Sequence, residues 1–261
     1  MVESLSKNVI SIVTVVLNDV GNIEATIQSV LSQVGCDIEY IVIDGGSSDG
    51  TLDVIKKYHD RIQYYCSEKD QGIYFAMNKA IDVAEGQWML FMNSGDTFFC
   101  STILYDVFGK GSPNADVIYG QSIVTYGNDA MRKVIPGKIE DIWKGLFSSH
   151  QAMFVRTALL QTNRFDCDFK LAADYELVSK LFHLGYHFLY VPEVIAVISA
   201  EGVSDTMRPA VFRENASISS RYFANKPYRI YFIWKCIDGF FRALAKKILP
   251  KQLIRRMQTT K

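Results

Sequence analysis

Three aspartates stand at positions where a carboxylate could do chemistry. Asp44 ends the apolar run 38–43, Asp96 follows the apolar run 88–92 after a short turn, and Asp174 begins a helical pattern. The carboxyl ends of parallel strands are where α/β sheets bind their ligands. Two acids at two such ends therefore predict a site for a nucleotide, a metal ion or both, and Asp174 adds a candidate base.

Asp44 opens the segment Asp-Gly-Gly-Ser-Ser-Asp-Gly-Thr at residues 44–51. Its glycines allow a ligand to approach closely, so the carboxylate could bind a base or ribose. Asp, Gly and Ser also favour turns whatever the function, and residues 47–49 are typical helix caps. The segment is neither a dinucleotide fingerprint nor a Walker A sequence.

Asn93-Ser94-Gly95-Asp96 marks a sudden change from core residues to small polar ones. Asp96 offers a hard oxygen ligand for Mg²⁺ or Mn²⁺, and Asn93 could add an amide oxygen or contact a nucleotide. The alternative is a turn closed by Asn and Asp. A second acid, Asp44, on a neighbouring strand end favours the metal site.

Asp174 shares one side of the predicted helix 171–184 with Val178 and Leu181, so it is expected to face the interior. Partial burial would raise its pKa toward that of a useful general base. The alternative role is a favourable interaction with the helix dipole. Glu176 is expected to face away, into solvent.

Composition excludes several classes of protein. The chain has 261 residues, of which 49% are hydrophobic and 21% charged, as in globular proteins. Lys plus Arg equals Asp plus Glu at 28 each, so no overall field favours nucleic acid. Five scattered cysteines indicate neither zinc nor disulfides and favour a reducing cytosolic setting.

Strand and helix patterns alternate along the first hundred residues. Strands are predicted at 9–17, 38–43, 61–66 and 88–92, with helices between them, then strands at 117–119, 123–126 and 188–191. This alternation predicts an α/β fold with a mainly parallel central sheet flanked by helices. The run 9–17 is too short to span a bilayer. We expect one domain over residues 1–225 and a helical tail over 226–261.

The tail alternates apolar and basic residues from 228 to 257, and Asp238 is its only acid. Aromatic and cationic residues together are typical of a helix that lies in a membrane interface. The alternative is a helix that packs on the core with a solvated basic face. His183 and His187 are spaced like a zinc pair, but Gly185 between them predicts a helix end, so we interpret both as structural.

Four segments in order resemble the family 2 glycosyltransferases of the GT-A fold over about residues 8 to 205. They are Val13-Thr14-Val15-Val16-Leu17-Asn18, Ile43-Asp44-Gly45-Gly46-Ser47-Ser48-Asp49-Gly50-Thr51, Asn93-Ser94-Gly95-Asp96 and Ala173-Asp174-Tyr175-Glu176-Leu177. The segment Gly72-Ile73-Tyr74-Phe75-Ala76-Met77-Asn78 is similar to the bacterial surface-polysaccharide branch.

The resemblance implies a role for each matched residue. Asn18 and Asp44 would bind the nucleotide, and Asp70 and Asn78 would line the donor sugar and diphosphate. Asp96 would hold the divalent metal, His150 would lie on the acceptor side, and Asp174 would be the catalytic base. The metal motif departs from the family pattern, because Asn93 and Gly95 stand where acids are usual.

The function implied by the resemblance is inverting transfer of a sugar from a nucleotide-diphosphate donor, with Mg²⁺ or Mn²⁺, to an acceptor hydroxyl. The basic tail suits a lipid-linked oligosaccharide acceptor at the inner face of the cytoplasmic membrane. One rival is a sugar-nucleotide pyrophosphorylase, which would need a glycine-rich, Arg-containing loop that residues 18–21 do not form. The other is a non-catalytic partner subunit that binds the nucleotide sugar.

Overall fold

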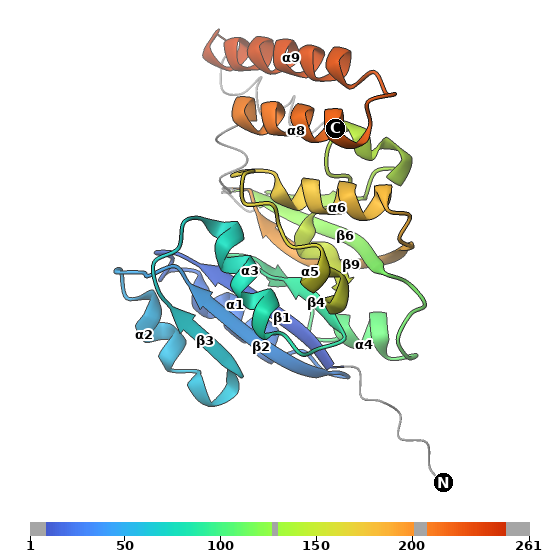
Figure 1. Cartoon of the computed structure of the whole chain (residues 1–261). Coiled ribbons are helices and arrows are strands. Elements are labelled where there is room, and N and C mark those ends of the chain that lie inside the picture. The colour runs from blue at the N-terminus through green and yellow to red at the C-terminus, as the bar shows by residue number, and fades with distance from the viewer. Residues whose placement is uncertain (1–8, 127–129, 201–207, 249–261) are drawn as a thin grey trace.

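The computed structural model describes residues 9–126, 130–200 and 208–248, and nine strands in these ranges form one mixed sheet (Figure 1). Its first half is parallel, in the order β3-β2-β1-β4. These strands are β1 (Val9–Val16), β2 (Asp37–Asp44), β3 (Tyr64–Ser67) and β4 (Trp88–Phe91). The predicted α/β fold is confirmed.

The second half of the sheet is mixed. Its strands are β5 (Thr97–Phe98), β6 (Val117–Tyr126), β7 (Ala130–Val134), β8 (Met153–Arg156) and β9 (Phe188–Ser199). β8 runs antiparallel to both β4 and β6, whereas β6 and β9 are parallel. The two short strands predicted within 117–126 are one strand, because a bulge after Tyr119 lets it stay paired with β9.

Helices cover both faces of the sheet (Figure 1). Alternate residues of β1 point to opposite sides, so Ile10 and Ile12 enter one core and Val13 and Val15 the other. The first core takes α1 (Ile23–Leu31), α2 (Thr51–Lys56) and α4 (Ile103–Phe108); the second takes α3 (Ile73–Val83), α5 (Thr157–Thr162) and α6 (Ala173–His183). Because β1 is buried on both faces, its sequence is an almost continuous apolar run.

Two further helices stack outward from α6. α8 (Arg208–Tyr222) packs on α6 and on the 3₁₀ segment η2 (Ile139–Lys144), and α9 (Tyr228–Ile248) packs on α8 and η2 (Figure 1). The predicted helical tail is therefore present as far as Ile248, and its residues 249–261 lie outside the described ranges. No helix in the described part of the chain is long and apolar enough to cross a membrane.

Thr14 fixes the end of β4 against β1. Its buried hydroxyl donates to the Met92 carbonyl at 2.8 Å and accepts from the Tyr40 hydroxyl at 3.0 Å. Buried polar groups that lose their partner are costly. This one side chain therefore joins β1, β2 and the exit of β4, immediately before the turn that carries Asn93 and Asp96.

Thr14→Val is expected to lower the free energy of unfolding by about 1–3 kcal/mol, because two buried polar groups lose a partner. Denaturant unfolding measures this. Tyr40→Phe removes one of those partners, so the double variant should be destabilised by less than the sum of the two single changes. Additive effects would contradict the hydrogen-bond network.

Candidate active site

The turn after β4 is held by β1 and α1. The Ser94 amide donates to the Val15 carbonyl at 3.2 Å, which extends the strand contact past the end of β4. The Thr26 hydroxyl donates to the Asp96 carbonyl at 2.8 Å and accepts from the Gly95 amide at 3.1 Å. Gly95 has φ +90°, a left-handed conformation that favours glycine. The turn is thus fixed before any ligand binds.

Asp96 is buried and each of its carboxylate oxygens accepts a hydrogen bond. Gln151 Nε2, in the 3₁₀ segment η3 (His150–Ala152), donates to Oδ2 at 2.8 Å, and the Ser199 amide donates to Oδ1 at 3.2 Å. Burial raises the pKa of Asp96, although the Gln151 hydrogen bond and the nearby His150 oppose the shift. The hydrogen bond from Gln151 therefore favours the charged form of Asp96.

The donor set at Asp96 fits a weakly held divalent cation. The described ranges contain no group of three or more His, Cys, Asp or Glu side chains that could hold a metal. Each Asp96 oxygen accepts a single hydrogen bond and keeps a lone pair for a cation. Mg²⁺ typically uses one or two carboxylates and takes its other ligands from substrate phosphates and water. Asp96 suits that arrangement.

Asp19 is a second acid at this turn that sequence reasoning missed. Its carboxylate accepts a hydrogen bond from the Ser94 hydroxyl at 2.6 Å, and its charge contributes to raising the pKa of Asp96. The available signal was its position next to Asn18, directly after β1. Asp19 brings negative charge to a site where the resemblance indicated a deficit of acids.

Asp174, His150 and Asn93 form a continuous hydrogen-bonded group, called here the Asp174 network. His150 Nδ1 lies 3.2 Å from Asp174 Oδ2, and His150 Nε2 lies 3.1 Å from Asn93 Nδ2. With the Asn93 amide donating to Nε2, His150 Nδ1 is the ring atom that donates to Asp174. The other amide atom, Asn93 Oδ1, is buried without a hydrogen-bond partner.

Two further donors hold the other oxygen of Asp174. The Tyr74 hydroxyl and the Tyr175 amide donate to Oδ1 at 3.2 and 2.8 Å. Burial raises the pKa of Asp174, but the hydrogen bond and charge of His150, with these donors, outweigh it and hold the pKa below its ordinary value. The expected rise in pKa is wrong, because sequence reasoning counted burial alone. Asp174 is ionised at neutral pH.

Asn18 and Asp44 meet at the neighbouring strand ends. Asp44 is buried and accepts from the Ser67 hydroxyl and from the amide and hydroxyl of Ser47. The Asn18 amide donates to Ser47 Oγ at 2.7 Å, and Asn18 Oδ1 accepts from the Ser48 amide at 2.9 Å. Asp44 therefore also stabilises the turn that follows β2, which was the alternative to ligand binding. The hydrogen bonds of the loop hold its carboxylate in place.

Hydrogen bonds connect the two halves of the site through adjacent residues. Asn18 joins the Asp44 loop, its neighbour Asp19 joins Ser94, and Asn93 in the same turn joins the Asp174 network. The three acids singled out from the sequence thus lie along one connected polar edge of the sheet.

Asp70 and Asn78 have protein partners of their own. Asp70 pairs with Lys79, and its Oδ2 is buried without a hydrogen bond. Asn78 Nδ2 donates to the Phe165 carbonyl at 3.0 Å, and Asn78 Oδ1 accepts from the Phe165 amide at 3.1 Å. Asn78 thereby connects α3 to the segment that leads into α6. Donor-sugar roles for Asp70 and Asn78 stay predictions.

Glu176 is buried, so its expected exposure is wrong. Its Oε1 accepts from the Tyr222 hydroxyl and from Arg221 at 3.2 Å. The physical reason is that α8 covers this side of α6, and nothing near residue 176 in the sequence indicates that cover. Burial of this acid without its α8 partners would be strongly unfavourable.

Glu214 of α8 caps the start of α6, in an arrangement called here the Glu214 cap. Its carboxylate accepts from the amides of Lys170, Leu171 and Ala172 at 3.0, 2.9 and 2.9 Å. These three amides belong to the residues immediately before α6, and a negative charge beside a helix start is favourable. Because Asp174 lies in the first turn, the Glu214 cap fixes the part of α6 that carries it.

A family model described as Glycosyl transferase family 2 matches residues 11–172. The chain belongs to glycosyl transferase family 2. The resemblance drawn from the sequence is confirmed. The family match ends just before α6, so the Asp174 network spans its boundary.

Relatives and solved structures agree with this family 2 assignment. The "PGL/p-HBAD biosynthesis glycosyltransferase" of Mycobacterium bovis (strain BCG / Pasteur 1173P2) is 28% identical over 225 residues, 81% of this chain and 85% of that protein. The "Putative teichuronic acid biosynthesis glycosyltransferase TuaG" of Bacillus subtilis (strain 168) is 36% identical over 93 residues, 34% of this chain and 37% of that protein.

The structure of the mannosyltransferase PcManGT from Pyrobaculum calidifontis, in complex with GDP-Man and Mn²⁺, has a TM-score of 0.62. It is 13% identical, and the match covers 96% of this chain and 78% of that one. Likeness at this identity shows the fold alone. That fold is GT-A, as the sequence predicted.

Glu214→Gln is expected to lower the free energy of unfolding by about 1–3 kcal/mol, because an amide group replaces one oxygen that accepts from backbone N–H groups. Thermal or denaturant unfolding measures this. Glu193→Gln, a matched change of a half-buried glutamate on β9, is the control. Equal stability of Glu214→Gln and the unchanged chain would refute the Glu214 cap.

His150→Ala is expected to raise the pKa of Asp174, since burial remains while the opposing hydrogen bond and charge are lost. A carboxylate base is active above its pKa, so the acid limb of the kcat/KM profile for sugar transfer should move to higher pH. The profile is measured beside that of His59→Ala, an exposed histidine on η1 (His59–Arg61). An acid limb that stays in place would contradict the interaction.

Proposed function

We propose that this chain is an inverting glycosyltransferase that moves a sugar from a nucleotide-diphosphate donor to a hydroxyl of a lipid-linked oligosaccharide, in the synthesis of a bacterial surface polysaccharide. The observation that carries the proposal is the Asp174 network. It holds an ionised, partly exposed carboxylate on the polar edge that also holds Asp96 and Asp44.

In this reaction the acceptor oxygen bonds to the anomeric carbon as the bond from that carbon to the diphosphate breaks. Asp174 would take the proton of the attacking hydroxyl, because its carboxylate is held ionised on this polar edge. His150 keeps the carboxylate in one orientation and stabilises its charged form. Asn18 and Asp44 would hold the nucleotide, and His150 would border the acceptor.

A divalent metal, Mg²⁺ or Mn²⁺, would be held by Asp96 and would supply positive charge for the departing diphosphate. The solved neighbour with GDP-Man and Mn²⁺ supports both a nucleotide-sugar donor and a metal. The buried position of Asp96, with its raised pKa, supports a cation that arrives with the donor. We therefore expect metal affinity to be low in the absence of donor.

The acceptor class is proposed from the relatives. One is named for PGL/p-HBAD biosynthesis and another for teichuronic acid biosynthesis. Both names place the relatives in biosynthetic glycosyl transfer, and we propose for this chain a lipid-linked acceptor at the inner face of the cytoplasmic membrane. The basic tail supports that position, because cationic segments are attracted to anionic lipid.

The proposal is tested by assaying transfer from a panel of UDP- and GDP-sugars with Mg²⁺, with Mn²⁺ and with EDTA. Asp174→Asn is expected to lower kcat by about 10²–10⁴-fold, the usual contribution of a positioned base, while donor affinity is retained. Asp168→Asn, an exposed aspartate before the same helix, is the matched control.

Near-normal turnover by Asp174→Asn would refute the assignment of the base. Donor binding by calorimetry without transfer from any donor would favour the non-catalytic partner instead. Formation of a nucleotide sugar from a nucleoside triphosphate and a sugar phosphate would favour the pyrophosphorylase.

A further inference from the structure

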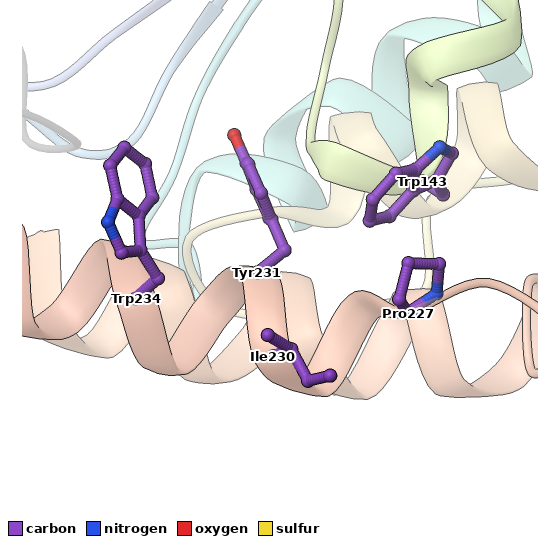
Figure 2. A pocket seen from close by; sticks show the side chains of 5 residues that line it. All are labelled: Trp143, Pro227, Ile230, Tyr231 and Trp234. Carbon is purple, nitrogen blue, oxygen red and sulfur yellow. The ribbon is translucent and has the colours of Figure 1, made fainter.

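An aromatic cleft lies between η2 and α9, away from the polar edge of the sheet. It has a volume of about 280 Å³ and is lined by Trp143, Pro227, Ile230, Tyr231 and Trp234. Figure 2 shows the Trp143, Tyr231 and Trp234 rings side by side above the helix. The Trp143 and Tyr231 rings meet edge to face at 5.5 Å. Its lining is apolar side chains, so the cleft suits an apolar chain and not a polar ligand.

The outer side of α9 continues this apolar surface. Ile230, Ile233, Trp234 and Ile237 follow helical spacing and form an exposed stripe, each side chain being between 50% and 74% exposed. The helix already buries Tyr228 and Phe232 against the fold. The exposed stripe is thus a second apolar face. A contiguous exposed apolar patch marks an interaction site.

Lysines flank the cleft. Lys235 Nζ lies 5.5 Å from the centre of the Tyr231 ring and 5.6 Å from that of Trp234, and Lys144 Nζ lies 5.1 Å from that of Trp143. Lys144 also pairs with Asp141 at 2.8 Å. At a membrane surface, such ammonium groups can contact lipid phosphates while the neighbouring rings enter the apolar layer beneath the phosphates.

Positive charge is concentrated in the tail, which carries Lys235, and the rest of the chain has a net negative charge. Residues 226–261 contain ten Lys and Arg against one Asp, whereas residues 1–225 contain eighteen against twenty-seven Asp and Glu. An anionic surface therefore attracts the tail and repels the rest of the chain, which orients the protein. A symmetric dimer through α9 would instead bring two cationic helices together, because each copy offers the same patch.

We propose that the aromatic cleft and the exposed stripe form one docking surface for the acidic phospholipids of a bilayer. The cleft takes an acyl chain, Ile233 and Ile237 enter the interface beside it, and Lys144 and Lys235 meet the phosphates. Trp143 belongs to η2 and the other cleft residues belong to the tail, so both parts of the chain form the docking surface. The inference extends the proposed function, but it is tested by binding alone.

The experiment uses the full chain with vesicles of phosphatidylcholine, with or without phosphatidylglycerol, whose acyl chains carry bromine. The chain has three tryptophans, and Trp88 is fully buried. Bromine quenches nearby indole fluorescence, so phosphatidylglycerol vesicles should quench Trp143 and Trp234. A Trp143→Phe/Trp234→Phe variant keeps only Trp88 and should show no quenching.

Co-sedimentation with the same vesicles measures affinity. Ile230→Ser/Ile233→Ser and Lys235→Glu are each expected to weaken binding by about tenfold or more. Met131→Ser/Ile135→Ser removes equally exposed apolar side chains at β7 and should bind normally.

Three results would overturn the proposal. They are binding that does not depend on phosphatidylglycerol, binding that survives loss of the exposed stripe, and self-association that the stripe variant abolishes without any vesicle binding. Each of them leaves the sugar-transfer assay unaffected, so a failed docking surface and a failed transferase proposal are told apart.

Discussion

The contact between Asp174 and His150 is the constraint on which the site depends. A partly buried carboxylate is stabilised when donors satisfy both of its oxygens, and for Asp174 they come from α6, α3 and η3. His150 in turn meets Asn93, so the ring connects Asp174 to the turn after β4. Elements that are more than fifty residues apart in sequence are thereby held in one geometry by a single imidazole.

The sheet and the C-terminal helices contribute to this geometry from opposite sides. β1, through Thr14 and its backbone, fixes the turn that carries Asn93 and Asp96. α8, through the Glu214 cap and the buried Glu176, fixes the helix that carries Asp174. The two sides meet at His150. Rigid positioning of this kind is what a displacement reaction requires of its catalyst.

Local sequence patterns were enough to predict the parallel half of the sheet and the strand ends that carry Asp44 and Asp96. Apolar runs bounded by Gly, Asp and Ser are short-range signals, and the structure follows them. The direction of the pKa shift of Asp174 and the burial of Glu176 were missed, because both depend on partners from distant segments. The continuous β6 was missed because its bulge is stabilised by β9, which follows about seventy residues later.

The position of Glu214 limits how far the chain can be truncated from its C-terminal side. The family match stops at residue 172, two residues before Asp174 and more than forty before Glu214. A fragment ending at that limit would keep Asn18, Asp44 and Asp96 and lose Asp174. A fragment that keeps Asp174 together with the Glu214 cap and the Tyr222 partner of Glu176 must reach at least Tyr222, so α8 supports the helix that carries Asp174.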